Sequence, residues 1–319
     1  MIINWKTKAF IQKYIARLPD AISYEIYFQM QRSLGALKKP FDPFEHFAAG
    51  VDMIKSIEKY GKISGKTFFE VGTGHVPLFP ITFWLCGAGK IVTIDLNPYM
   101  RNEIILDLLF FVKTKEDETR KIFGELLNEE RFNLLLHYSG RKKNLQQEIL
   151  KLCQIEYIVP GDAAKTKLPE KCIDYHISHR VYEHIPLTVI YDILKEGNRI
   201  IAEDGLFVNL IDYKDHFAYM DSNISAINFL RFSDKEWSKY AGNRFTYLNR
   251  ARHDDFVELF KSVGHEFLEV DPYIDKKVEE ILENNELILD EQFRNKTKEI
   301  LSIIESFFIT KKIVDKTEN

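Results

Sequence analysis

The stretch that decides the fold is residues 67–97, TFFEVGTGHVPLFPITFWLCGAGKIVTIDLN. Its apolar run Thr67–Val71 predicts a buried strand, and Val76–Leu85 is an apolar segment long enough for a helix. A glycine-bearing turn, Gly72-Thr73-Gly74, separates the two. The β-rich run Lys90–Ile94 predicts a second strand. Strand, turn, helix and strand in this order form a βαβ unit.

An acid closes this unit, because Asp95 follows the second strand. A carboxylate about 20 residues past such glycines is the layout that holds an adenosine-type cofactor. Glycines let the backbone approach a ligand without a Cβ in the way, and the start of the helix offers free N–H groups. Asp95 can accept both ribose hydroxyls. It disfavours a 2′-phosphate, which argues against NADP.

Two details of the turn narrow the choice of cofactor further. A pyrophosphate binder has the pattern G-x-G-x-x-G, whereas Gly72-x-Gly74 continues as His75-Val76-Pro77 without a third glycine. Glu70 precedes the turn, and a carboxylate is unfavourable beside a pyrophosphate but favourable beside an ammonium. S-adenosylmethionine carries an ammonium and a sulfonium and no phosphate.

The segment Glu70–Gly74 resembles the first motif of class I S-adenosylmethionine-dependent methyltransferases, and Asp95 resembles their ribose-binding acid. The resemblance implies that the cofactor is S-adenosylmethionine. It implies cofactor contacts for the following residues: Glu70, Gly72, Thr73, Gly74, Asp95 and Leu96. The departure from the family pattern is Val76, where many members carry a third glycine. The plainer reading is an ordinary βαβ unit with a tight turn.

The third strand is expected at Ile155–Val159, followed by Pro160-Gly161-Asp162-Ala163. An acid just past the third strand matches the position at which these methyltransferases bind the adenine amino group, so the resemblance implies cofactor contacts for Asp162 and Ala163. The alternative is an Asp that caps a helix or a turn.

The fourth strand is expected at Cys172–Ser178, and Val181–Pro186 reads VYEHIP. Many class I methyltransferases run from this strand into a segment like V-L-E-H-I-P, at the edge of the sheet where ligands bind. The resemblance places Ser178, His179 and Arg180 along the methionine part of the cofactor. For Glu183 and His184, contact with substrate or cofactor and a purely structural role in the turn are both open.

The predicted fold is a Rossmann-like seven-stranded methyltransferase sheet with helices on both faces and an antiparallel seventh strand. Residues 1–60 read as an N-terminal helical segment that either caps the site or forms an interface. Residues 61–313 form the methyltransferase domain. Within it, 98–151 is a helical insertion and 214–250 a lid-like, aromatic-rich substrate segment. Residues 314–319 are a polar tail.

Length, composition and charge limit the classes of function that the chain can have. The chain has 319 residues, a net charge of −4 and 45% hydrophobic residues, so it can bury a sizeable core and has no global electrostatic reason to bind nucleic acid. Its three cysteines show no C-x-x-C and predict a reducing compartment without structural zinc. We expect a cytoplasmic protein without a signal peptide or membrane span. Its oligomeric state is open, with a homodimer as one option.

Methyl transfer to a hydroxyl needs a base. His216 is the first candidate because it follows the fifth strand, expected at Leu206–Ile211, and imidazole titrates near neutrality. Asp212 is the second candidate, followed by His179 and His184. Four residues could also hold a divalent metal, but their spacing matches no metal template, so no resident metal is predicted: Asp212, Asp215, His216 and Asp221.

The acceptor is expected to be a small molecule or a glycan. The place after the fourth strand holds Ser178-His179-Arg180-Val181 rather than the N/D-P-P-Y motif of enzymes that methylate base amino groups, and no cysteine follows a proline. Residues 214–250 are similar to bacterial methyltransferase-like proteins associated with surface-polysaccharide biosynthesis. Two alternatives stay open. One is an NAD-dependent oxidoreductase and the other a non-catalytic protein that binds S-adenosylmethionine.

Overall fold

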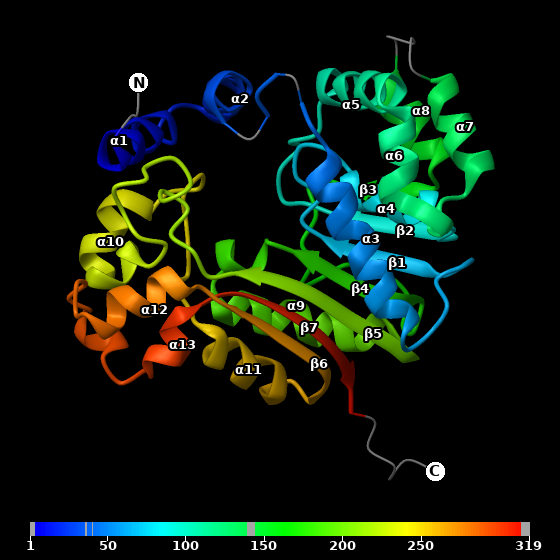
Figure 1. Ribbon diagram of the computed structural model, residues 1–319. Coiled ribbons are helices and arrows are strands. Elements are labelled where there is room, and N and C mark those ends of the chain that lie inside the picture. The colour runs from blue at the N-terminus through cyan, green and yellow to red at the C-terminus, as the bar shows by residue number, and fades with distance from the viewer. Residues whose placement is uncertain (1–3, 36, 40, 139–143, 314–319) are drawn as a thin grey trace. The chain divides into compact units, whose positions relative to one another are not determined.

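The computed structural model describes residues 4–35, 37–39, 41–138 and 144–313. Within them, seven strands form one mixed sheet in the order β3-β2-β1-β4-β5-β7-β6, with helices on both faces (Figure 1). This confirms the predicted fold class. The predicted polar tail, 314–319, lies outside the described residues. The strands are β1 Thr67–Val71, β2 Lys90–Ile94, β3 Ile155–Ile158, β4 Ile173–His179, β5 Ile201–Asp212, β6 His265–Ile274 and β7 Ile303–Lys312.

Two compact units make up the chain. Unit 1 comprises residues 1–35, 179–192 and 209–308, and unit 2 comprises residues 36–178, 193–208 and 309–319. Among the described residues, no helix is both long and apolar enough to cross a bilayer.

Unit 2 contains the parallel strands β1 to β4. β1 pairs in parallel with β2 on one side and with β4 on the other, and β2 pairs in parallel with β3. The order of the strands therefore reverses at β1 and β4. In open α/β sheets, ligands bind outside the carboxyl ends of the strands at such a switch point.

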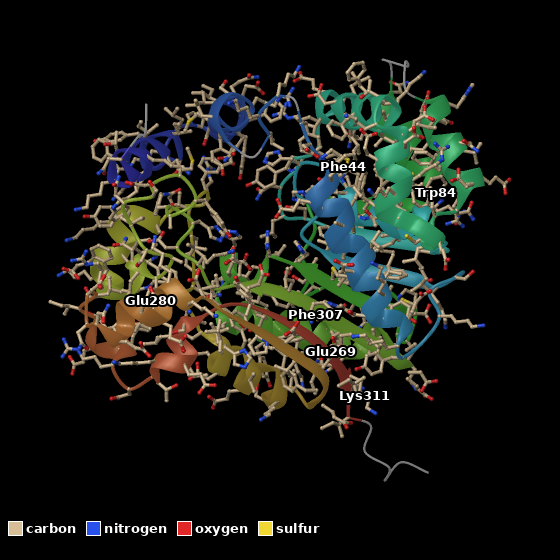
Figure 2. All side chains as sticks on the ribbon, in the orientation of Figure 1. Phe44, Trp84, Glu269, Glu280, Phe307 and Lys311 are labelled. Atoms are coloured by element: carbon tan, nitrogen blue, oxygen red, sulfur yellow. The ribbon has the colours of Figure 1, made fainter. Side chains whose placement is uncertain are left out.

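The helices of unit 2 include those in the described parts of the predicted insertion, residues 98–138 and 144–151, which are mainly helical as expected. Their bounds are α3 Phe44–Glu58, α4 Leu78–Leu85, α5 Asn102–Thr114, α6 Glu116–Phe123, the short 3₁₀ turn η1 Gly124–Leu126, α7 Glu129–His137 and α8 Leu145–Leu152. Helix α3, which begins at Phe44, packs on α4, which carries Trp84 (Figure 2). A Cβ on Gly50 of α3 would lie 2.8 Å from the Thr82 side chain, so only glycine allows this close packing.

Unit 1 has a core of its own. Trp5, Phe217, Phe229 and Trp237 are all buried and pack against one another. Its helical elements are α1 Trp5–Ile15, α2 Asp20–Leu34, η2 Tyr182–His184, η3 Asn228–Arg231, α10 Asp234–Ala241, α11 His253–Ser262, α12 Lys276–Glu283, η4 Glu291–Phe293 and α13 Lys298–Ser302; helix α9, Leu187–Ile200, includes residues of both units. The N–H of Tyr213, just past β5, donates to the carbonyl of Ile304 at the start of β7 (2.8 Å), so these neighbouring strands run antiparallel.

The apolar spacing on the N-terminal helices describes an exposed face. Phe10, Tyr14 and Leu18 recur at a spacing of four, yet their side chains are exposed. The buried face of α1 is instead formed by Trp5, Ala9, Gln12 and Ile15. A spacing of four is typical of a helix, and α1 is one, but the spacing does not identify the face that packs on α10.

Two boundaries differ from the sequence-based expectation. Gly205 directly precedes the strand predicted at Leu206–Ile211, a place that suits a helix cap or a turn into that strand, but β5 already begins at Ile201 and runs through it. A Cβ there would lie 2.9 Å from the carbonyl oxygen of Asp174, so close backbone approach explains this glycine. The charged amphipathic pattern of residues 276–289 predicts a helix over that whole range, but helix α12 ends at Glu283, because Asn284 caps it and Asn285 adopts a positive φ of 54°.

Candidate functional site

The glycine turn of unit 2 is fixed by hydrogen bonds that its backbone N–H groups donate. Gly72 and Gly74 have φ angles of 88° and 65°, which side-chain-bearing residues rarely adopt. The Gly72 N–H donates to the carbonyl of Ile94, and the Gly74 N–H donates to Oδ2 of Asp95, both at 2.9 Å. The predicted glycines and the predicted ribose acid are therefore directly bonded. A Cβ on Gly74 would meet no protein atom within 4 Å, so the space beside it is open.

Beneath the turn lies a short chain of buried polar groups. The Thr93 hydroxyl donates to Oε2 of Glu70, and the Thr73 hydroxyl bonds to that of Thr93, each at 2.5 Å. Thr93 thus links the Glu70 carboxyl to the Thr73 hydroxyl. Burial raises the pKa of Glu70 to about 8, although the Thr93 hydrogen bond opposes this shift; the charge of Asp95 adds to it. A nearby cation would reverse the shift.

Asp95 joins the ends of two neighbouring strands. Its Oδ1 accepts the Asn97 N–H (3.0 Å), and its carbonyl accepts the Gly161 N–H (2.9 Å), which brings the segment after β3 to the end of β2. Each carboxylate oxygen keeps a lone pair for a ligand hydroxyl. Leu96, the next residue, is 67% exposed and offers an apolar surface beside the acid.

The predicted adenine contact is only partly assembled. Ala163 is buried, while the exposed side chain of Asp162 accepts the Ala164 N–H (2.9 Å), as a turn-capping Asp would. Gly161 is required by packing, because a Cβ there would lie 2.5 Å from the Ile94 side chain. The adenine role of Asp162 stays a prediction.

Ser178 lies at the switch point itself. It pairs with Val71, so it stands level with the last residue of β1 before the glycine turn. Its side chain is buried, and its hydroxyl has no hydrogen-bond partner within the described part of the chain. Buried hydroxyls are normally satisfied, so this one is free to bond a ligand or water.

In unit 1, the VYEHIP segment forms the 3₁₀ turn η2. Asn249 fixes this turn through three hydrogen bonds. Its side-chain amide donates to the carbonyls of Tyr182 and Ile185, both at 2.8 Å, and its own N–H donates to the carbonyl of Glu183 (2.9 Å). The Glu183 side chain in this turn is only 3% exposed, and neither carboxylate oxygen has a hydrogen-bond partner among the described residues. Burial and the nearby charge of Asp212 raise the pKa of Glu183 well above its ordinary value.

His184 and His216 lie against Glu183. The two imidazole rings meet edge to face with centroids 4.8 Å apart, and ligand atoms of all three residues lie within 4.8 Å of one another. Nδ1 of His184 is 2.9 Å from the carbonyl of Tyr247. A carbonyl can only accept, so this nitrogen carries the proton and Nε2 keeps a lone pair.

Asp212 supports His216. Its Oδ2 is 3.4 Å from Nε2 of His216 and accepts the Tyr219 hydroxyl, and its Oδ1 accepts the Lys214 N–H (2.9 Å). Burial alone would raise the pKa of Asp212, but His216, Lys214 and the Tyr219 hydroxyl together lower it below its ordinary value. Asp212 is therefore an ionised carboxylate that can orient an imidazole. Both predicted catalytic residues, His216 and Asp212, are brought together.

The remaining predicted residues have other partners. His179 ends β4, and the Arg180 guanidinium bonds Oε2 of Glu305 (3.0 and 2.8 Å). Asp215 accepts the Phe217 N–H (2.9 Å) and Asp221 accepts the Trp5 N–H (3.0 Å). These two acids shape the loop after β5.

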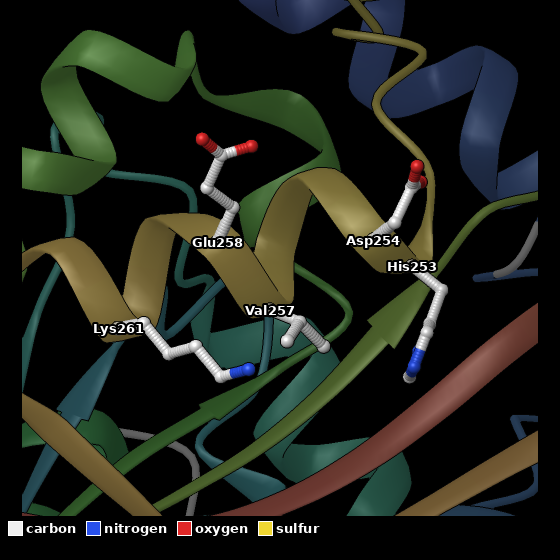
Figure 3. Close-up of a pocket in the computed structure, with 5 residues that line it drawn as sticks. All are labelled: His253, Asp254, Val257, Glu258 and Lys261. Atoms are coloured by element: carbon white, nitrogen blue, oxygen red, sulfur yellow. The ribbon is translucent and has the colours of Figure 1, made fainter. Parts of the chain in front are cut away.

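A separate hollow on α11 contains none of the predicted residues. Figure 3 shows the side chains that line it, all from that one helix: His253, Asp254, Val257, Glu258 and Lys261. Both carboxylate oxygens of Asp254 already bond Nζ of Lys296 (2.8 Å). The polar clusters described above are the better candidates for chemistry.

Sequence analysis missed three residues that hold the polar groups of these sites in place: Thr93, Asn249 and Tyr219. Thr93 carried a signal, since it is the one polar residue among the four that follow Lys90 in the strand KIVTI. Asn249 and Tyr219 carried none, because their partners lie 67 and 7 residues away and a fold is needed to bring Asn249 to η2.

No family model matches the chain, and no curated protein matches it. Among solved structures, it is similar to a S-adenosylmethionine-dependent methyltransferase of Methanosarcina mazei (13% identity, TM-score 0.44, 82% of this chain and 98% of that one). A TehB-like S-adenosylmethionine-dependent methyltransferase of Corynebacterium glutamicum gives 14% identity, a TM-score of 0.42, and coverage of 92% and 100%.

A Haemonchus contortus phosphoethanolamine N-methyltransferase, solved with phosphomonomethylethanolamine and S-adenosylhomocysteine, gives 13% identity and a TM-score of 0.49. It matches over 98% of this chain and 61% of its own. At these levels of identity the similarities identify neither a family nor a substrate.

Proposed function

We propose that the protein is an S-adenosylmethionine-dependent methyltransferase that acts on a hydroxyl group. The observation that carries the proposal is the turn of unit 2, where a buried carboxyl, two glycines in left-handed conformations and a strand-end acid are bonded into one structure. Glu70 is the buried carboxyl and Asp95 the acid.

Each part of the turn matches a part of this cofactor. Asp95 accepts the ribose hydroxyls, and the exposed Leu96 gives the adenine an apolar surface. The open space beside Gly74 admits the methionine portion, and the free hydroxyl of Ser178 adds a donor. The cofactor's ammonium compensates Glu70, which is otherwise a buried carboxyl with a pKa of about 8. Thr73, Asp162, Ala163, His179 and Arg180 complete the proposed set.

The same features disfavour an NAD-dependent oxidoreductase. The phosphates of a dinucleotide would have to approach the Glu70 carboxyl, which the ammonium of S-adenosylmethionine would instead stabilise. The sheet also departs from the usual dinucleotide-binding order 3-2-1-4-5-6, because β7 is inserted between β5 and β6.

In the proposed reaction the acceptor hydroxyl loses its proton to His216, which Asp212 orients. The acceptor oxygen then forms a bond to the methyl carbon as the carbon–sulfur bond breaks. The sulfur keeps the electron pair, and S-adenosylhomocysteine leaves. Alignment of the acceptor with the methyl group supplies much of the rate.

The expected acceptor is a small molecule or a sugar, including a cytoplasmic polysaccharide precursor, on the resemblance of residues 214–250. Most aromatic side chains of that segment lie in the core of unit 1, so they do not support a sugar-binding face; Tyr219, 56% exposed, is the one large ring of the His216 loop that remains available. Residues 1–60 are proposed as a cap and 214–250 as a lid.

The test is turnover. Purified protein is incubated with S-adenosylmethionine and a panel of hydroxyl acceptors, sugars first, and release of S-adenosylhomocysteine is measured. Acceptor-dependent release by the wild type is expected, and a lower rate in Asp95→Ala when S-adenosylmethionine is limiting. Binding of S-adenosylhomocysteine without turnover on any acceptor would favour a non-catalytic cofactor-binding protein.

A further inference from the structure

Unit 1 carries a site that the methyltransferase proposal does not use fully. One carboxylate and two imidazoles converge there, from Glu183, His184 and His216. Two of the three are neighbours in the chain, and the third is 32 residues away, so the fold creates the grouping. We propose that this cluster binds a divalent transition-metal ion.

The first argument is the state of Glu183. It is 97% buried, and both its oxygens lack hydrogen-bond partners within the described residues. A buried carboxylate without a partner is expensive, and native proteins pair such groups with donors or with metal ions. The donors that act on it are the backbone N–H groups of Glu183 itself and of Asp212, and no described side chain forms a hydrogen bond with it. An ion held with the two histidines would accept its lone pairs and neutralise its charge.

The second argument is the outer shell. A metal-binding histidine usually donates its other ring N–H to a carbonyl or a carboxylate, which fixes the tautomer. His184 does this through Nδ1 to the carbonyl of Tyr247, whereas Nε2 of His216 lies 3.4 Å from Oδ2 of Asp212 without completing a hydrogen bond. Asp212 is held in turn by the Tyr219 hydroxyl and the Lys214 N–H.

The donor set indicates the class of ion. Imidazole suits zinc, iron, copper and nickel, while magnesium and calcium prefer oxygen ligands. Two histidines and one carboxylate, with remaining positions open, are the ligand set of catalytic zinc and of non-haem iron(II) sites. Glu183 and Asp212 together balance the charge of a divalent ion. The set differs from the four residues weighed in the sequence, of which Asp215 and Asp221 have other partners.

An open position at the ion would take water or a substrate hydroxyl and lower its pKa. In the loaded protein the ion would take over the activation of the acceptor that His216 performs alone otherwise. This role in methyl transfer rests on the proposed function, but ion binding itself does not.

The experiment uses the full-length protein, stripped with a chelator and dialysed against Zn²⁺ or Co²⁺. One ion per chain by elemental analysis, a visible absorption band from bound Co²⁺ and a metal-dependent rise in melting temperature are expected. Glu183→Gln and His184→Gln should each weaken binding by at least about 100-fold, the upper end of the loss seen when an outer-shell partner is removed. His137→Gln, at an exposed histidine of α7, should bind like the wild type.

Glu183→Gln keeps the shape of the side chain, so it should fold, and its melting temperature should no longer respond to Zn²⁺. Failure of the wild type to take up either ion, or equal uptake by Glu183→Gln, would overturn the metal site. S-adenosylhomocysteine binding is measured on the same samples. If it persists without metal uptake, only the metal proposal fails; if it is absent while metal binds, only the proposed function fails.

Discussion

The glycine turn of unit 2 and the histidine cluster of unit 1 differ in how their polar groups are satisfied. At the turn, Glu70 and Asp95 both accept hydrogen bonds from the protein. At the cluster, Glu183 is buried with neither oxygen bonded among the described residues. We therefore propose that the turn is a preorganised binding site, and that the groups of the cluster are completed by what binds there. The four predictions that follow test this contrast.

The largest effect is expected at the cluster. His216→Ala should lower turnover by about 10²–10⁴-fold, the usual contribution of a positioned acid–base group, while the affinity for S-adenosylhomocysteine stays near wild type. Steady-state rates and calorimetric titration on the same variant measure the two quantities. Wild-type turnover would show that His216 takes no part in the reaction. A parallel loss of cofactor affinity would show that His216 contributes to cofactor binding.

The next effect is expected at the turn. Asp95→Ala should weaken S-adenosylhomocysteine binding by about 1.5–3 kcal/mol, the value of a hydrogen bond to a charged group. This corresponds to roughly 10–150-fold in Kd. Asp162→Ala, at an exposed side chain that caps its own turn, should cost less. Equal losses for both variants would contradict the ribose role of Asp95.

A smaller effect concerns Glu70 and pH. Its raised pKa, about 8, means that the free protein holds a proton there at neutral pH. The cofactor's ammonium favours the ionised carboxylate, so binding should release up to about one proton and tighten by up to about tenfold per pH unit between pH 6 and 8. Calorimetry in two buffers of different ionisation enthalpy counts the protons. Glu70→Gln should abolish the release; persistence of the release in that variant would place the ammonium elsewhere.

The smallest effect compares two glycines in the same conformation. Gly74 and Gly264 have φ angles of 65° and 81°, and a Cβ on either meets no protein atom within 4 Å. Each Gly→Ala change should therefore cost a similar stability, about 1–2 kcal/mol, in denaturant unfolding. Only Gly74→Ala should also weaken S-adenosylhomocysteine binding. If both variants bind alike, the open space beside Gly74 is not occupied by the cofactor.

The difference between the turn and the cluster also explains which parts of each could be predicted from the sequence. The turn lies within residues 67–97, so its strands, its glycines and its acid can be recognised from local spacing, and the structure gives β1 and β2 the predicted bounds. The cluster needs the chain after β4 and the chain after β5 to meet, so its three members could only be named separately. Asn249, which fixes Glu183, has no local signal at all.

Errors arose where a residue pattern has two structural causes. A glycine after a helical segment suits a cap, yet Gly205 is a strand residue beside the Asp174 carbonyl. Apolar residues at a spacing of four predict a buried stripe, yet Phe10 and Tyr14 are exposed, because α1 uses its other face to pack. Aromatic residues in a loop suggest a binding surface, yet Trp237 is core.

The most direct test of the central claim, that the turn binds S-adenosylmethionine, is calorimetric titration of the wild-type protein with S-adenosylhomocysteine and, separately, with NAD. We predict micromolar binding of S-adenosylhomocysteine, one per chain, and no heat from NAD. Binding of NAD with no response to S-adenosylhomocysteine would contradict the account and favour the oxidoreductase, with Asp95 on the ribose of a dinucleotide.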